Sequence, residues 1–166
     1  AGEEQLGGLE LTLAHAVSRP TLVLARATAL MLGTIILAAL VGLAVAALNQ
    51  PAHLGLSWWG ILAASVGLGM VVLFHGLLAL AVGAATGSKG WATAVATGVA
   101  FGGYFLGSLG DLWFDWAPRL SPFYWAYGQR PMVNGFDPTG LALLALGCLA
   151  FLLIAVLGFQ RRDLRV

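Results

Sequence analysis

The sequence predicts an all-α membrane protein: a polytopic bundle of four transmembrane helices, preceded by an amphipathic cytoplasmic helix and completed by short outer-leaflet helices. Composition is the first observation behind this prediction, since 60% of the 166 residues are hydrophobic and only 9% are charged. A soluble domain has about 25% charged residues. The second observation is a set of four apolar runs, each too long for a core helix of a soluble domain. The chain therefore belongs in a bilayer.

Charge and cysteine content exclude several other classes. The net charge is only +1, and the eight basic residues are scattered rather than clustered. Nothing in this pattern favours nucleic acid as a partner. The single cysteine, Cys148, lies inside an apolar run, which excludes intrachain disulfides and cysteine-based metal sites.

Each apolar run is long enough to cross about 30 Å of hydrocarbon as a helix. The first ends at Asn-Gln-Pro, because Pro51 cannot continue the helical hydrogen-bond ladder. The second is so long that it must tilt, kink or protrude, and only Ser-Lys separates it from the third. The fourth is followed by a polar tail, residues 160–166. The predicted spans are residues 27–48, 58–87, 90–110 and 140–159.

The positions of the basic residues predict the orientation of the bundle. Six of the eight fall on one side, which the positive-inside rule makes cytoplasmic. Four spans then place both termini in the cytoplasm, and loop 111–138 lies outside the cell. Those six residues are Arg19, Arg26, Lys89, Arg161, Arg162 and Arg165.

The opening segment, residues 1–20, has the pattern of an amphipathic helix. Leu6, Leu9 and Leu13 fall on one stripe, and polar residues such as Glu4 and His15 take the opposite face. An anionic inner leaflet repels carboxylates, so the acidic segment favours a protein partner over plain lipid adhesion. The chain begins at Ala rather than Met, and we expect it to be the later part of a longer protein or a processed product.

Three segments carry a family resemblance. "EEQLGGLELTLAHAVSRP" before a span, "LSPFYWAYGQRP" at residues 120–131 and the ending "FQRRDLRV" together resemble type-2 ABC transporter permeases. The match covers nearly the whole chain as the last four spans of a six-span half. Two points depart from the family pattern: two earlier spans with their amphipathic helix are missing from these residues, and Ala16 stands where the family often has Pro.

The resemblance implies that the opening helix couples these spans to a separate cytoplasmic ABC ATPase. ATP and Mg²⁺ are then expected on that partner, because this chain has no glycine-rich phosphate loop. We expect no cofactor, metal or catalytic residue on this chain. The expected partners are a second permease copy or half and the surrounding membrane lipid. The expected location is a bacterial plasma membrane. The alternative for the opening helix is an interfacial anchor. The candidate coupling residues are Glu3, Glu4, Glu10, Leu13, His15 and Arg19.

The predicted function is the membrane-spanning part of an ATP-driven exporter. Its cargo is expected to be amphipathic or lipid-like, because the apolar, glycine-rich spans offer no charged site for a polar solute. Two alternatives stay open, an intramembrane enzyme that uses His75 and a non-catalytic scaffold subunit. The candidate substrate path or gate comprises Met70, Phe74, His75, Phe123 and Tyr124.

Three further features have two readings each. His75 is the only titratable side chain deep in a span; it either lines a water-filled path or is a neutral imidazole bonded to a neighbouring helix. The aromatic residues of loop 111–138 form either a simple interfacial belt or short helices in the outer leaflet, broken at Pro118, Pro122 and Pro131. The third span carries two small-residue faces that serve packing inside the subunit or a dimer seam; these are Gly98, Gly102, Gly103 and Gly107.

Overall fold

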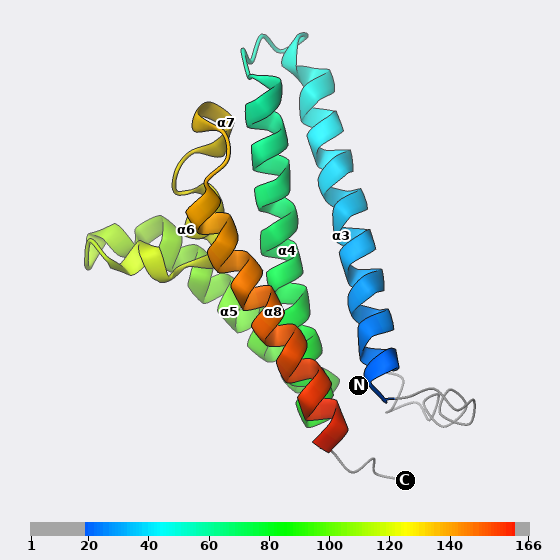
Figure 1. Cartoon of the computed structure of the whole chain (residues 1–166). Helices are drawn as coiled ribbons and strands as arrows, with labels where there is room; N and C mark the ends of the chain where they lie inside the picture. The colour runs from blue at the N-terminus through cyan, green and yellow to red at the C-terminus, as the bar shows by residue number, and fades with distance from the viewer. Residues whose placement is uncertain (1–18, 162–166) are drawn as a thin grey trace.

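Four long helices dominate the computed structural model, which describes residues 19–161 (Figure 1). All four are long and apolar enough to cross a membrane, so the prediction of an all-α bundle with four spans is confirmed. The predicted opening helix falls on residues 1–18, outside the described residues. The four long helices are α3 (Arg19–Asn49), α4 (Trp58–Thr86), α5 (Lys89–Leu109) and α8 (Pro138–Arg161).

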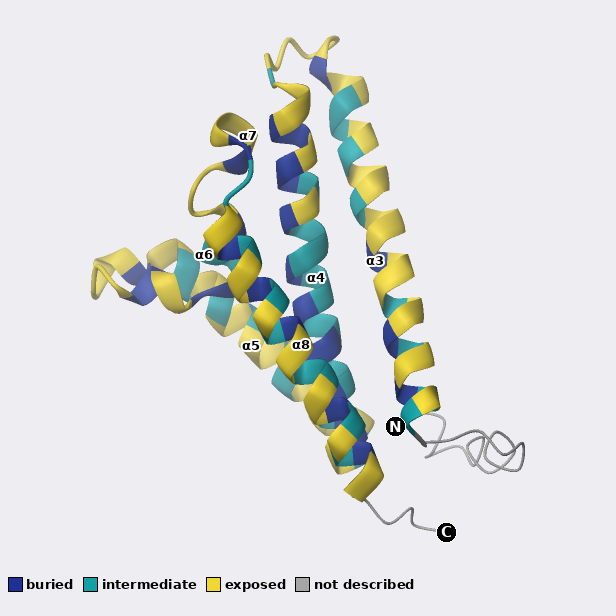
Figure 2. Ribbon diagram, in the orientation of Figure 1, coloured by how far each residue is buried: buried dark blue, intermediate teal, exposed yellow. Residues whose placement is uncertain are grey.

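Helix α4 is the centre of the bundle. It contacts α3, α5 and α8 along the spans and also α6 and α7 of the segment between α5 and α8. Most of the buried surface in Figure 2 lies on α4 and on the side of α8 that faces it, whereas α3 and α5 are largely exposed. The described helices therefore pack around α4 and leave the outer faces of α3 and α5 open.

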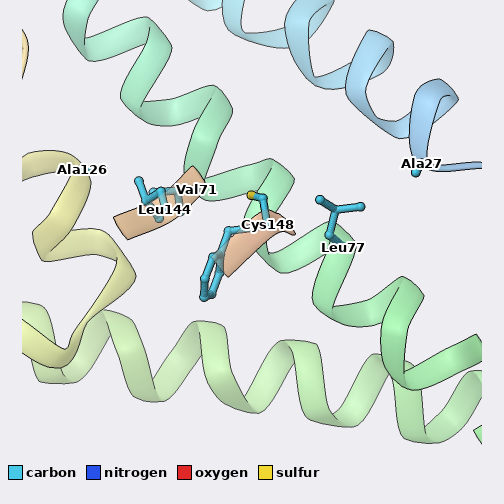
Figure 3. Close-up of a cluster of buried hydrophobic side chains, with 7 residues drawn as sticks. Ala27, Val71, Leu77, Ala126, Leu144 and Cys148 are labelled. Carbon is cyan, nitrogen blue, oxygen red and sulfur yellow. The ribbon is translucent and has the colours of Figure 1, made fainter. Parts of the chain in front are cut away.

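The core lies between α4 and α8. Phe74 of α4 packs edge to face with Phe151 of α8 at a ring distance of 5.0 Å, and Gly147 leaves the room that this ring occupies. Lipid tails are as apolar as leucine, so close packing rather than water exclusion stabilises such a core in a membrane. The buried cluster consists of Ala27, Val71, Phe74, Leu77, Ala126, Leu144 and Cys148 (Figure 3).

Helix α3 is longer than the predicted first span. It begins at Arg19 instead of residue 27, and Pro20 lies in its first turn. A proline is tolerated there because the N–H groups of the first turn have no partner within the helix. Hydropathy falls near Arg26, but the helical backbone does not end there. At its other end, the Asn49 side chain closes the connection to α4 by bonding both the N–H and the carbonyl of Leu56, at 3.0 and 2.8 Å.

The segment between α5 and α8 forms four short helices: η1 (Gly110–Leu112), η2 (Ala117–Leu120), α6 (Pro122–Tyr127) and α7 (Pro131–Asn134). Short helices separated at prolines were one of the two readings expected here. Pro118, Pro122 and Pro131 each lie at the start of one of these short helices, as that reading expects. A proline has its φ preset for a helix and lacks only an N–H that the first turn does not need.

Candidate functional site

An apolar groove runs between α3 and α4. Its volume is about 760 Å³, within the 300–1,000 Å³ typical of small-molecule sites. We call it the α3–α4 groove. The α3 wall is formed by Met31, Thr34, Ile35, Ala38, Ala39, Gly42, Leu43 and Ala46, and the α4 wall by Trp58, Ile61, Leu62, Ser65, Val66, Gly69, Met70 and Leu73.

Small residues set the spacing of the two walls. A side chain at Gly42 would begin 2.5 Å from the Ser65 hydroxyl, and one at Gly69 would begin 3.3 Å from the Ala38 methyl group. Because these backbones approach closely, α3 stays against α4 along a contact line at these positions. The residues of this contact line belong to the groove lining, together with larger side chains.

The groove offers almost no polar chemistry. Thr34 and Ser65 are the polar side chains among its lining residues. Their hydroxyls already donate to the carbonyls of Leu30 and Ile61 in their own helices, both at 2.8 Å. Apart from the remaining hydroxyl lone pairs and the indole N–H of Trp58, the lining side chains are apolar, so the groove suits an apolar molecule or the apolar part of an amphipathic one.

The structure divides the predicted path residues between two sides of α4. Met70 lines the α3–α4 groove, whereas Phe74 is buried in the core against α8. His75 lies 5.5 Å from the Phe123 ring of α6, and Phe123 in turn meets Tyr104 of α5 at 5.9 Å. These three rings join α4, α6 and α5. Tyr124, the fifth predicted residue, follows Phe123 in α6 and is half-buried.

The imidazole of His75 has one bonded and one unbonded nitrogen. Nδ1 lies 2.8 Å from the Val71 carbonyl of the same helix. A carbonyl can only accept, so Nδ1 carries a proton. Nε2 is buried and has no hydrogen-bond partner among the described residues. Among the described residues, the ring therefore bonds to its own helix, not to a neighbouring one, and meets the Phe123 ring of α6 at a tilt of 38°.

The two small-residue faces of α5 differ in their surroundings. A side chain at Gly103 or Gly107 would meet the start of α6, with the Ser121 hydroxyl 2.7 Å from the new atom at position 107. At Gly98 and Gly102, nothing described lies within 4 Å of an added methyl group. Gly103 and Gly107 thus serve packing inside the chain, and Gly98 and Gly102 face outward.

Ser121 is a structural residue that the sequence analysis did not single out. Its side chain is fully buried and caps α6 by accepting from the N–H groups of Phe123 and Tyr124, at 3.1 and 3.4 Å. The same hydroxyl donates to the Gly103 carbonyl of α5 at 2.7 Å. A serine directly before a proline is a recognisable helix-start signal, and within "LSPFYW" it marks this joint.

The candidate coupling residues fall almost entirely outside the described part of the chain. Glu3, Glu4, Glu10, Leu13 and His15 precede residue 19, and Arg19 is the first residue of α3. Within residues 19–161, no group of three His, Cys, Asp or Glu side chains is placed to hold a metal ion.

Comparison with known families identifies the chain. Residues 1–160 match a family model described as the C-terminal domain of the multidrug efflux system permease Rv1217c. No curated protein and no solved structure matches. The match spans all four membrane helices and confirms the predicted relation to the C-terminal part of an ABC-type permease. The chain therefore belongs to the family of multidrug efflux permease C-terminal domains and is a multi-pass transport subunit of an efflux system.

Proposed function

We propose that this chain is the C-terminal membrane part of an ATP-driven exporter, and that its α3–α4 groove receives the apolar part of an amphipathic drug, antibiotic or lipid. The groove is the observation that carries the proposal, because its size suits a drug-sized molecule and its lining contains no charged side chain. Membership in a multidrug efflux family supports the same class of cargo.

The predicted energy source is a separate ABC ATPase that binds ATP and Mg²⁺. Helix α3 supports this part of the proposal because it is one continuous helix of 31 residues, about 46 Å long. It begins at Arg19, the last of the predicted coupling residues, and forms one wall of the groove. A displacement at its first turn is thereby carried to the groove without an intervening hinge, as a shift of α3 against α4.

A second permease copy or half, the bacterial plasma membrane and cytoplasmic termini complete the proposal. The outward-facing Gly98 and Gly102 and the exposed outer face of α5 leave surface for further membrane helices. Arg26, Lys89 and Arg161 lie at the end of the bundle where α3 and α5 begin and α8 ends, which the positive-inside rule places in the cytoplasm.

Transport of a lipophilic dye tests the groove. Ala39 lines the groove with an exposed methyl group, so Ala39→Trp fills it without disturbing the contact line at Gly42. We expect ATP-dependent Nile red efflux from vesicles that hold the complete transport system to fall at least tenfold. Ala44→Trp is the matched control, because Ala44 is exposed on α3 and does not line the groove. Equal efflux by the two variants contradicts the groove assignment.

ATPase association tests the coupling. Glu10→Lys and Leu13→Asp change the charge and the apolar stripe of the opening segment. We expect both variants to lose co-purification with the ATPase and transport-linked ATP hydrolysis, while their unfolding transition is unchanged. Unchanged association and turnover in both would favour the interfacial-anchor alternative and reject the coupling role.

A further inference from the structure

The segment between α5 and α8 runs beside the middle of α4 instead of beyond its end. The ring of Phe123 in α6 lies 5.5 Å from that of His75, which is about 25 Å along α4 from Trp58. A side chain at Gly67, nearer the start of α4, would meet Ala126 of α6. The chain after α5 therefore rises along α4 from the level of His75 toward Trp58.

Residues 110–120, which include η1 and η2, form a tip that projects from this segment. We call it the η1–η2 tip. At its base, Ser121 donates to the Gly103 carbonyl of α5 at 2.7 Å. Figure 1 shows the tip in yellow-green, extending sideways from the bundle at a level between the two ends of α4.

The base of the tip lies at membrane depth. Helix α4 has 29 residues and is about 43 Å long, whereas the hydrocarbon core of a bilayer is about 30 Å thick. Wherever such a core is placed along α4, it includes the level of His75, about 25 Å from one end of the helix and about 16 Å from the other.

Three charged side chains lie on the tip: Asp111, Asp115 and Arg119, all exposed. Within residues 19–161, none of these three side chains forms an ion pair or a hydrogen bond. Arg119 accepts a bond from Trp125, but through its main-chain carbonyl. Charged side chains inside a membrane face other protein or a water-filled cavity, because hydrocarbon does not solvate them. Lipid tails are therefore an unsuitable neighbour for the tip.

Large apolar side chains stand among these charges and are exposed as well. Leu112, Trp113 and Phe114 are 77%, 62% and 59% exposed, and the ring of Trp116 stacks on that of Phe114 at 5.5 Å. Water is an unsuitable neighbour for these side chains, and exposed apolar patches of this kind mark interaction sites. Protein interfaces accommodate both kinds of residue, because they are enriched in aromatic residues and arginine. The composition of the tip is that of a protein–protein interface.

We propose that the η1–η2 tip is the surface through which a second copy of this chain binds. A two-fold axis makes every contact reciprocal, so a tip that carries both signs of charge is complementary to itself. Asp111 and Asp115 of one copy face Arg119 of its partner, and the pairing occurs twice. The contact continues onto α5, where Gly98 and Gly102 face outward. This inference rests on the proposed second permease copy and names its contact surface.

Energy transfer between two differently labelled populations of the full chain tests the surface in lipid vesicles, with neither ATPase nor cargo present. Arg119→Asp turns attraction into repulsion, and we expect association to weaken at least about tenfold. A triple variant with Asp111→Arg and Asp115→Arg added exchanges the two signs and is expected to restore association. Arg130→Asp is the matched control, because Arg130 is exposed in the same segment but outside the tip.

A second variant keeps all three charges. Trp113→Ala removes an exposed ring, and we expect association to weaken at least about fivefold while thermal unfolding of the chain stays unchanged. Labelling of Asp115→Cys by a membrane-impermeant maleimide as fast as that of Arg130→Cys places the tip in water and overturns the proposal.

The remaining outcomes are equally decisive. Absence of energy transfer in the parent overturns the proposal, and so does parent-like association in both Arg119→Asp and Trp113→Ala. The second result leaves the proposed second copy standing and moves its contact elsewhere. Loss of transport with intact association defeats the exporter function without touching this interface.

Discussion

The Ser121 hydroxyl donates a hydrogen bond of 2.7 Å to the main-chain carbonyl of Gly103, across 18 residues of sequence. The same oxygen caps α6. One side chain therefore joins the third span to the segment that precedes the fourth. This joint determines where Phe123 meets the ring of His75.

Replacing Ser121 tests the joint. Ser121→Ala removes a helix cap, which costs about 1 kcal/mol, and a hydrogen bond to the Gly103 carbonyl, which is worth about 0.5–1.5 kcal/mol. We expect a total loss of about 1.5–2.5 kcal/mol in the free energy of unfolding, measured by denaturant titration in detergent. Ser108→Ala, at an exposed serine of α5, should have no effect. Similar losses in the two variants would contradict the assigned role.

The glycines of α5 give a paired prediction. Gly107→Ala places a methyl group 2.7 Å from the Ser121 hydroxyl, and such overpacking costs about 1–3 kcal/mol. Gly98→Ala meets nothing described within 4 Å and replaces a poor helix former by the best one, a gain of up to about 1 kcal/mol. Thermal unfolding of the purified variants measures the difference. The assignment of the two faces fails if Gly98→Ala is the more destabilising change.

Two substitutions at His75 separate the contribution of its ring packing to stability from that of its polar nitrogen. His75→Phe keeps a ring against Phe123 and removes the unpartnered Nε2, so we expect its stability to equal or exceed that of the parent. His75→Ala loses the ring contacts with Phe74 and Phe123, each worth about 0.5–1.5 kcal/mol, and opens a cavity. We expect a loss of about 2–4 kcal/mol in its free energy of unfolding.

If His75 lies in the substrate path, as predicted, its replacement must also affect transport. His75→Phe must lower Nile red efflux even though its stability equals or exceeds that of the parent. Parent-like efflux from this variant would leave His75 with packing as its only role. Retained ATP turnover in the same vesicles shows that the transport complex is still assembled.

The burial of Tyr127 predicts that the stability of the fold falls at alkaline pH. It lies in α6 beside Gly67, and partial burial raises the pKa of its hydroxyl from 10.0. Its folded-state pKa is thus above its unfolded value, so the stability it contributes is complete below pH 10 and falls as pH rises through the folded pKa. Melting temperatures of the parent and Tyr127→Phe should agree near neutrality and diverge above pH 10, with the variant the more stable. Parallel alkaline profiles would contradict this assignment.

Local properties of the sequence were sufficient to predict the four spans and the family. The length and apolarity of a run such as 140–159 decide whether it can cross a membrane, and neither depends on distant residues. The family pattern in "LSPFYWAYGQRP" is equally local. The predicted span starts at residue 27, where hydropathy rises, whereas α3 starts at Arg19, because charge near Arg26 lowers hydropathy without breaking a helix. The prolines between α5 and α8 are a local signal as well, because a proline fits the first turn of a helix but not its interior.

By itself, the sequence determined that the chain lies in a membrane, how many times it crosses it, and which family of transport proteins it resembles. Only the tertiary structure decided which face of each span is packed, where the α3–α4 groove lies, and that Phe123 of α6 meets His75 of α4. The physical reason is that lipid and core are both apolar, so the outward and inward faces of a membrane helix carry the same kinds of residue. Contacts between residues far apart in sequence select the packed face, and α4 is central because its glycines and small side chains admit neighbours on several sides.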